Sequence, residues 1–214
     1  ELLGKVEMRE LLDPAIIAQF EREAQRLDPA RRARGVEGVA DLLRLLGPLT
    51  AAEVAARLQP PDTAGEGSTA GDAATAGEGS TAGPAPAAGE ASTAAPADRD
   101  EPPHATPEAA AALLDELVGA RRAIRVSVGG AERVAAIEDA GRLRDALGAA
   151  LPVGIPTAFL EPVVDPLADL VARHARTHGP FRTSDVAARL GIGAAVARQT
   201  LQRLESQGRL ASGF

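Results

Sequence analysis

One segment of twelve residues occurs twice in this 214-residue chain, and this duplication constrains the fold more than any other feature. Residues 47–58 recur as residues 179–190, at an offset of 132 positions and without a gap. Each copy follows an apolar helical segment, begins with Gly-Pro, continues through a Thr- or Ser-containing cap and ends in Val-Ala-Ala-Arg-Leu. Because Gly-Pro ends one helix and the cap begins another, each copy predicts a short turn between two helices.

The segments around each copy extend this pattern. Near the first copy, one helix is predicted at residues 38–46 and another begins at Thr106 and Pro107, which have the residue types of an N-cap and a first turn. Residues 124–128 and 132–137 then alternate around a Gly-Gly turn, which predicts a β-hairpin. This order of elements is typical of a winged helix-turn-helix. We therefore predict a mainly α fold with small β-hairpin wings, built from tandem winged helix-turn-helix units.

The chain is expected to contain two such units and the segments that join them. The predicted regions are an N-terminal helical segment at 1–35, a first winged-helix unit at 36–150, a connector at 151–165 and a second winged-helix unit at 166–214 that is truncated at its wing. Because the chain begins at Glu1 and stops where a second strand is expected, we interpret it as a piece of a longer polypeptide.

A low-complexity insertion at about 60–105 interrupts the first unit between its second and third helices. Residues 63–71 recur at 75–83, and the stretch has too few large apolar side chains to offset the entropy of ordering its backbone. We therefore predict a disordered extension of a surface turn, which costs little free energy, instead of a linker between domains. A functional acidic tether is the alternative.

The charge of the chain is unevenly distributed. The net charge is −7, but residues 61–106 alone carry eight acidic residues and one Arg, whereas residues 166–214 carry seven Arg and three acidic residues. An anionic partner for the second unit is therefore compatible with the acidic total. No apolar run approaches the roughly 20 residues of a membrane-spanning helix. We expect no membrane partner and a cytoplasmic location, at the nucleoid.

Motifs for catalysis, metals or cofactors are missing from the sequence. It has no Cys and no phosphate-binding loop of the G-x-x-x-x-G-K-[ST] type. Glu138 and Asp139 follow the predicted hairpin, where we interpret them as helix-capping acids. Asp165, followed by Pro166, is likewise expected to cap the helix that opens the second unit. His174 and His178 lie four residues apart, but no carboxylate at a fitting spacing completes a metal site, so we interpret them as packing residues or helix C-terminal cations. We predict no catalytic residue, metal ligand or cofactor here.

The candidate nucleic-acid contacts lie on the helix predicted at residues 194–207. Its apolar side carries Ala197, Thr200, Leu201 and Leu204, and the opposite side presents amide and guanidinium groups that suit a sugar-phosphate backbone or a groove. The candidates there are Arg198, Gln199, Gln202 and Arg203, followed by Arg209 at the start of a wing. The alternative is an ordinary solvated helix face.

The corresponding helix of the first unit has the opposite charge. This third helix carries Glu108, Asp115 and Glu116 on the outward side, where they would repel phosphate. We therefore expect a packing or scaffold role for this unit. Any DNA contact there is expected at the hairpin, from Arg121, Arg122 and Arg125.

Three long strings carry a resemblance to a known family. Residues 6–14, 136–148 and 172–181 resemble the region after the ATP-dependent helicase core of long bacterial large helicase-related (Lhr) proteins. The likeness covers most of residues 1–58 and 107–214 and leaves out the insertion. It implies a superfamily 2 DNA-dependent ATPase that moves 3′ to 5′ on single-stranded DNA, unwinds RNA:DNA hybrids and functions in DNA repair.

The resemblance also implies partners. These are single-stranded DNA or an RNA:DNA hybrid, the upstream helicase core in cis, and a second copy in a homo-oligomer, with ATP and Mg²⁺ used by the upstream motor. In some members the C-terminal region, built of tandem winged helices and a β-barrel, removes uracil from DNA.

Three hypotheses for this part of the protein follow. The first is an accessory DNA-binding and assembly region of such a helicase. The second is part of a winged-helix DNA glycosylase, which needs a carboxylate that faces a flipped base and that we cannot place on any residue here. The third is a purely structural oligomerisation module. A free-standing transcription regulator is disfavoured, because such proteins usually begin near the helix-turn-helix.

Overall fold

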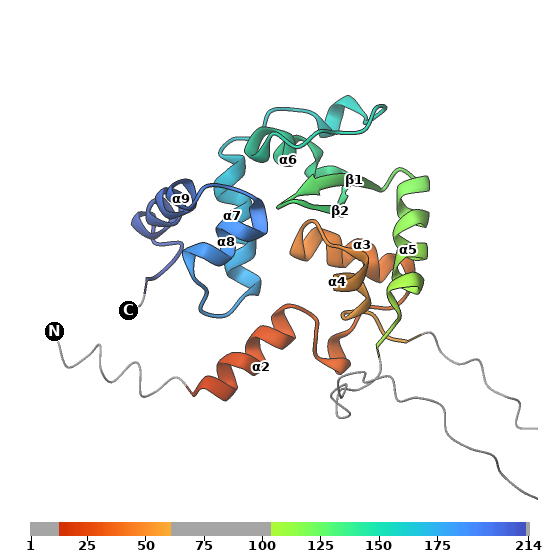
Figure 1. The fold of residues 1–214 in the computed structure, drawn as a ribbon, viewed down its shortest axis with the longest axis horizontal. Coiled ribbons are helices and arrows are strands. Elements are labelled where there is room, and N and C mark those ends of the chain that lie inside the picture. The colour runs from red at the N-terminus through yellow and green to blue at the C-terminus, as the bar shows by residue number, and fades with distance from the viewer. Residues whose placement is uncertain (1–12, 61–103, 213–214) are drawn as a thin grey trace, which may run out of the picture.

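A computed structural model describes residues 13–60 and 104–212 (Figure 1). Three stretches lie outside these ranges: residues 1–12 of the predicted N-terminal helical segment, residues 61–103 of the low-complexity insertion, and residues 213–214. In chain order the elements are α2 (Pro14–Ala24), η1 (Pro29–Arg31), α3 (Gly35–Leu46), α4 (Ala51–Ala55), α5 (Pro107–Gly119), β1 (Ala123–Val128), β2 (Ala131–Ala136), η2 (Ile137–Asp139), α6 (Ala140–Leu147), η3 (Thr157–Phe159), α7 (Pro166–Thr177), α8 (Thr183–Leu190) and α9 (Ala194–Ser206).

The predicted fold class is confirmed, and local sequence signals explain most element boundaries. The Thr50 hydroxyl accepts from the Glu53 N–H at 3.2 Å, and the Glu53 carboxylate accepts from the Thr50 N–H at 2.8 Å, which is the capping box expected at the start of α4. The Thr106 side chain likewise accepts from the Ala109 N–H ahead of α5. The hairpin turns at Gly129 and Gly130, both at positive φ.

The two ends of the insertion meet at the edge of the first unit. The Ala105 N–H donates to the Leu58 carbonyl at 3.2 Å, and both residues are buried. Ala33 forms a parallel bridge with Leu58 on the same edge, and its carbonyl accepts from the Gln59 N–H at 2.9 Å. The described residues on the two sides of the insertion are therefore neighbours at one edge of the first unit.

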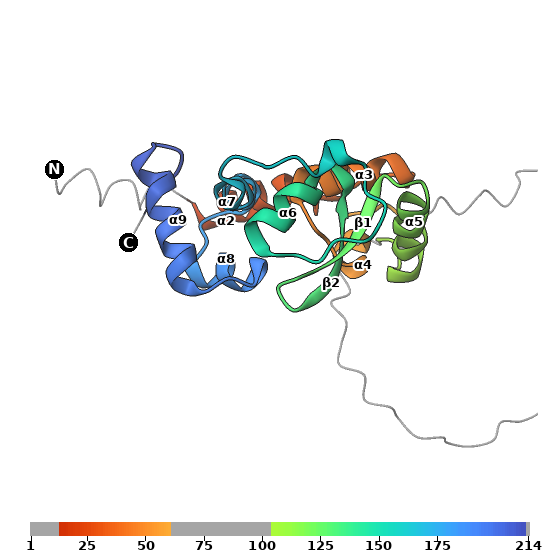
Figure 2. The same cartoon turned by 90° about the horizontal axis from the view of Figure 1, so that it is seen from above.

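The hairpin of β1 and β2 is shared by two hydrophobic cores. It is antiparallel, with Ala123 opposite Ala136 and Val128 opposite Ala131. Ala123, Val134 and Ala136 belong to a core with residues of α3, α4 and α5. Ile124, Val126, Val128 and Ala135 belong to a second core with residues of α6 to α9. Figure 2 shows the hairpin between these two groups of helices. Apolar residues on both faces of the hairpin are thus buried, although Arg125, Ser127 and Glu132 remain exposed, and the hairpin joins the two halves instead of projecting as a free wing.

The segment between α6 and α7 packs on α6. A Cβ added at Gly141 would lie 2.9 Å from the Glu161 carbonyl oxygen and 3.0 Å from that of Phe159. Glycine at this position therefore permits the close approach. Within the segment, Phe159 belongs to the short helix η3.

Two predicted helix caps are wrong. Asp165 precedes α7 in the left-handed region, at φ 51°, and its side chain makes no cap hydrogen bond. Asp139 precedes α6 and makes none either. Both carboxylates bind arginines from other elements instead, because a guanidinium offers a stronger, charge-assisted hydrogen bond than a backbone N–H.

Candidate nucleic-acid interface

The packing of α9 fixes which side chains it presents to solvent. Ala197, Thr200 and Leu204 are buried against the second core, as predicted, and the Thr200 hydroxyl donates to the Val196 carbonyl at 3.0 Å. The predicted candidates are all exposed: Arg198, Gln199, Gln202, Arg203 and, beyond the helix, Arg209. The sequence pattern therefore separated the two faces of this helix correctly.

The guanidinium groups of this face differ in their partners. Arg203 donates to Asp165 at 2.7 Å, in an ion pair in which both side chains are well exposed. Within the described ranges, Arg198 and Arg209 have no carboxylate partner. An exposed pair is weak, about 0–1 kcal/mol, so phosphate can compete for Arg203. Arg198, Arg203 and Arg209 thus exceed the one acidic side chain of α9, Glu205, which lines the same groove as Arg198.

A groove of about 790 Å³ lies beside α9. Phe181, Leu201 and Leu210 are among its apolar lining residues, and Arg198 and Gln202 lie at its α9 side. The repeat explains the location, because Phe181 corresponds to Leu49 of the first copy. The backbone of Leu49 pairs with that of Val134 on β2, with N–H to oxygen bonds of 2.9 and 2.8 Å. The groove thus occupies the place of a hairpin, which argues against a small-molecule site.

The helices α5 and α9 occupy equivalent places in their units. The Arg122 N–H donates to the Leu117 carbonyl after α5, and the Arg209 N–H donates to the Leu204 carbonyl after α9, both at 2.9 Å. The exposed side of α5 nevertheless carries acidic residues, as predicted: Glu108, Asp115 and Glu116. The same structural position is therefore acidic in the first unit and basic in the second.

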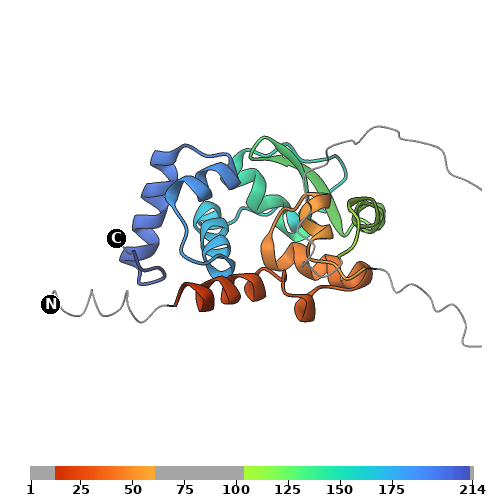
Figure 3. The ribbon, with the colours of Figure 1, turned by 60° about the horizontal axis from the view of Figure 1, so that its bottom comes forward.

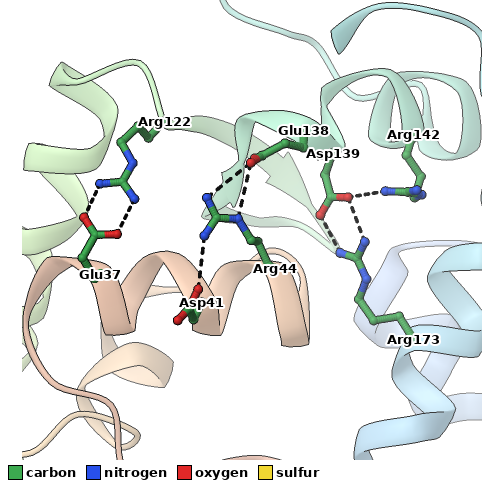
Figure 4. Close-up of polar contacts among 8 residues, drawn as sticks. All are labelled: Glu37, Asp41, Arg44, Arg122, Glu138, Asp139, Arg142 and Arg173. Carbon is green, nitrogen blue, oxygen red and sulfur yellow. Dashed lines mark hydrogen bonds and ion pairs between the residues drawn. The ribbon is translucent and has the colours of Figure 1, made fainter.

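Two of the three candidate arginines near the hairpin are paired with carboxylates. Arg122 donates to both oxygens of Glu37, at 2.5 and 2.6 Å (Figure 4), and this hydrogen bond lowers the pKa of Glu37. Arg125 donates to Asp115 and, at 2.9 Å, to Glu132. Arg121 is exposed and has no carboxylate partner among the residues that the structure describes. Arg122 and Arg125 therefore bring little uncompensated charge to this surface.

The turn of the hairpin contacts the second unit. A Cβ at Gly129 would lie 2.8 Å from the Arg189 carbonyl oxygen and 2.9 Å from that of Ala188, at the end of α8. A Cβ at Gly191, in the turn between α8 and α9, would in turn lie 3.0 Å from Gly129. Because the backbones meet this closely, the hairpin tip is occupied by an intramolecular contact.

Glu53 connects the two units, a role beyond the helix cap that its sequence motif predicts. Its carboxylate accepts from Arg133 on β2 at 2.6 Å and from Arg189 on α8. Burial alone would raise the pKa of Glu53, but the Thr50 N–H and the guanidiniums of Arg189 and Arg133 outweigh it and hold the pKa below its usual value. Arg189 also donates to the Pro48 carbonyl at 2.7 Å.

Asp139 forms a second junction between the units (Figure 4). Its carboxylate is almost fully buried and accepts from Arg173 of α7 at 2.5 and 2.8 Å, and from Arg142. Burial opposes the charge of Arg173, but the hydrogen bonds that it donates to Asp139 raise the pKa of that guanidinium. Neighbouring Glu138 pairs instead with exposed Arg44 at 3.3 Å.

The Arg in each Val-Ala-Ala-Arg-Leu copy is the sequence feature that could have indicated these contacts between units. Arg57, the equivalent of Arg189, is buried and donates to the carbonyl and side-chain oxygens of Gln25, at 2.9 and 2.7 Å. In each copy this side chain thus binds residues that precede its own unit. Arg57 binds the N-terminal segment, and Arg189 binds the first unit. A charged residue repeated inside an apolar helical motif predicts such a contact, because an arginine is rarely buried without partners.

His174 and His178 form a packed pair. Their rings stack with centroids 3.7 Å apart, and His174 meets Phe181 edge to face at 5.1 Å. Burial, and then the neighbouring His178, lower the pKa of His174 to about 4, so its ring is neutral at pH 7. Of the two roles predicted for these residues, His174 has the packing role. In the part of the chain that the structure describes, no group of three His, Cys, Asp or Glu side chains could hold a metal ion.

Comparisons with known proteins identify a matching family and two relatives of this chain. Residues 10–98 and 82–162 match a family model described as "Large helicase-related protein, winged-helix domain". The chain is 42% identical over 213 residues to a protein of Mycolicibacterium smegmatis named "Lhr helicase/ probable uracil glycosylase". It is 35% identical over 207 residues to one of Escherichia coli named "Lhr helicase/uracil glycosylase". All and 97% of the chain are covered, but only 11% and 10% of those relatives, so the chain spans about a tenth of their length.

No helix among residues 13–60 and 104–212 is long and apolar enough to cross a membrane.

Proposed function

We propose that this winged-helix region is an accessory DNA-binding module of a helicase and that α9 carries the contact with DNA. The premise is that the chain belongs to the large helicase-related (Lhr) family. In this proposal, ATP hydrolysis with Mg²⁺, unwinding and any role in DNA repair belong to the whole protein. The partners are single-stranded DNA or an RNA:DNA hybrid and the helicase core in cis.

The exposed face of α9 is the observation that carries this proposal. It presents Arg198, Gln202 and Arg203 on a helix whose opposite side is held rigidly in the second core. Guanidinium and amide groups on such a face can bind phosphate and sugar oxygens. The corresponding face of the first unit is acidic, and its hairpin tip contacts α8. We therefore place the main contact on the second unit.

Fluorescence anisotropy across a salt series tests the proposal. The Arg198→Ala/Arg203→Ala variant should bind labelled DNA more weakly, and the slope of log affinity against log salt should fall by roughly 1 for each phosphate that the variant no longer binds. Arg122→Ala/Arg125→Ala is the matched control, because it removes two arginines whose charges carboxylates already balance. Equal weakening by both pairs, or no weakening by the α9 pair, would contradict the assignment to α9.

The names of the two relatives favour a second candidate, a share in uracil excision. If the region only supports a glycosylase, this chain alone should leave uracil-containing DNA intact, while a longer polypeptide that includes the following region excises the base. Excision by the isolated chain, lost on one Asp or Glu substitution, would place the reaction within these residues. A purely structural oligomerisation module would instead show a stable multimer in sedimentation and no affinity for DNA.

A further inference from the structure

A second surface of the molecule combines an exposed aromatic ring with arginines. Phe20 projects from α2 with 60% of its surface exposed, although phenylalanine is usually buried. It lines a hollow of about 470 Å³ together with Leu45 of α3 and Arg176 of α7, hereafter the Phe20 hollow. In Figure 3, α2 (red) runs beneath α7 and continues toward α3.

The Phe20 hollow carries an excess of positive charge. Four arginines line it: Arg26, Arg31, Arg44 and Arg176. Glu23 pairs with Arg31 at 3.1 Å, and Asp41 and Glu138 pair with Arg44 at 3.2 and 3.3 Å. Among the described residues, Arg26 and Arg176 have no carboxylate partner. Two guanidiniums beside an exposed ring thus remain for an anionic ligand.

Arg26 occupies a backbone conformation that glycine normally fills. It ends α2 at φ 60°, in the left-handed region, where the Leu27 N–H donates back to the Arg22 carbonyl at 2.8 Å. The equivalent positions after α8 and α9 are Gly191 and Gly208, at φ 69° and 70°. An arginine in a conformation where a Cβ is sterically unfavourable supports the hypothesis of a functional role for its side chain.

The Phe20 hollow and the groove beside α9 flank the same loop. Thr177 lines the hollow, and Pro180, three residues later, lines the groove. Ile17 and Glu21 of α2 approach Gly179 between them, since a Cβ there would lie 3.4 Å from Ile17 Cγ2 and 3.0 Å from Glu21 Oε2. The two places therefore lie on either side of one short loop, and a strand that occupies both must pass the Glu21 carboxylate between them.

We infer that the Phe20 hollow is a second contact for single-stranded nucleic acid, where an unpaired base stacks on Phe20 and Arg26 and Arg176 bind the adjacent phosphates. An aromatic face flanked by positive charge is the usual means of binding a single strand without reading its sequence. A paired base within a duplex cannot stack in this way. The inference extends the proposed function, because it continues a strand from α9 to α2.

Affinity for single-stranded and blunt duplex DNA tests this inference on the 214-residue chain. Phe20→Leu keeps an apolar side chain but removes the ring, and should weaken single-strand binding about five-fold or more while leaving duplex binding within two-fold. Arg26→Gly should weaken single-strand binding and, because it relieves the left-handed conformation, leave the melting temperature unchanged or higher. Arg22→Ala, an exposed arginine of α2 outside the hollow, is the matched control and should bind as the parent does.

The outcomes separate the two proposals. If Arg198→Ala weakens binding but Phe20→Leu and Arg26→Gly do not, the Phe20 hollow is not a nucleic-acid contact and the assignment to α9 stands. If the α2 variants weaken binding and Arg198→Ala does not, the inference stands and the assignment to α9 fails. Unchanged single-strand affinity of both α2 variants, as expected if an acidic protein segment fills the hollow, overturns the inference.

Discussion

The two copies of the repeated segment begin the same kind of helix, but they differ in what surrounds them. In the first copy, Glu53 caps α4 and also binds Arg133 and Arg189 from two other elements. In the second copy, Asp185 accepts from the Arg182 N–H at 2.8 Å, which lowers the pKa of that carboxyl, and its other side-chain bond is local, to Ser184. The motif determines the turn and the cap, whereas its neighbours determine whether the acid also joins two units.

The third helices of the two units, α5 and α9, also differ in what surrounds them. The side of α5 that faces solvent is acidic, and the hairpin after it contributes side chains to two cores. The exposed side of α9 carries two arginines and one glutamate, and the groove beside it lies where the first unit has its hairpin. The same arrangement of helices therefore presents an acidic surface in the first unit and the proposed DNA-binding surface in the second, and the hairpin tip of the first unit is already in contact with α8.

The largest effect is expected from the junction between the units. Asp139→Asn removes the negative charge that compensates Arg173, which is mostly buried, and should lower the free energy of unfolding by about 3–5 kcal/mol. Glu138→Gln, next to it, breaks an exposed pair and should cost about 1 kcal/mol or less. Urea denaturation midpoints measure both. Similar costs for the two variants would show that the buried cluster does not hold the units together.

The histidine pair gives the second unit a pH-dependent contribution to stability at two positions where the first unit has leucines. By the repeat offset, His174 and His178 correspond to Leu42 and Leu46 of α3. The pKa of His174 is about 4 in the folded chain and about 6.5 in the unfolded chain. As the pH falls, His174 is therefore protonated in the unfolded chain before it is protonated in the folded chain. Stability should therefore fall as the pH is lowered from about 6.5 to about 4, by roughly 3 kcal/mol in total.

The His174→Leu variant restores the residue of the first unit and isolates this contribution. Its unfolding free energy, measured by urea titration between pH 7 and pH 4, should fall less steeply than that of the parent chain. The difference between the two curves removes the titration of the carboxyl groups, which both chains share. Parallel curves would mean that His174 titrates alike in the folded and unfolded states.

The contact of the hairpin tip with α8 is tested by two adjacent glycines. Gly129→Ala places a Cβ against backbone oxygens at 2.8 and 2.9 Å, whereas Gly130→Ala, at φ 76°, meets nothing within 4 Å. Both substitutions strain a left-handed residue, so their difference reports the contact alone. We expect Gly129→Ala to be less stable than Gly130→Ala by about 1–3 kcal/mol, measured by thermal or urea unfolding. Equal losses would show that the tip does not press on the second unit.

The smallest effect concerns the caps after the third helices. Arg121 ends α5 at φ 57°, where Gly208 ends α9 at φ 70°. Arg121→Gly should raise the free energy of unfolding by less than about 1 kcal/mol, because the relief of steric strain exceeds the added entropy of the unfolded chain only slightly. Thermal unfolding measures the gain. The DNA affinity of the same variant tests whether Arg121, a candidate contact from the sequence, takes part in binding.

Local interactions explain which elements could be predicted. The capping box at Thr50 and Glu53, the start of α5 at Thr106 and the hairpin turn at Gly129 each depend on residues within a few positions of one another. The predicted caps at Asp139 and Asp165 are wrong for the complementary reason. Arg173 lies 34 positions from Asp139, and Arg203 lies 38 positions from Asp165, so neither competing partner is visible in the local sequence.

The order of helices and hairpin, the duplicated motif and the two sides of α9 could be predicted from the sequence, because they depend on helical periodicity and on nearby caps. Contacts between distant segments, in contrast, bury apolar residues on both faces of the first hairpin, join two units through Glu53 and an arginine 136 positions away, and leave Phe20 exposed among arginines. Those outcomes depend on which distant surfaces meet, and the free energy of burying or pairing a side chain is set by that meeting.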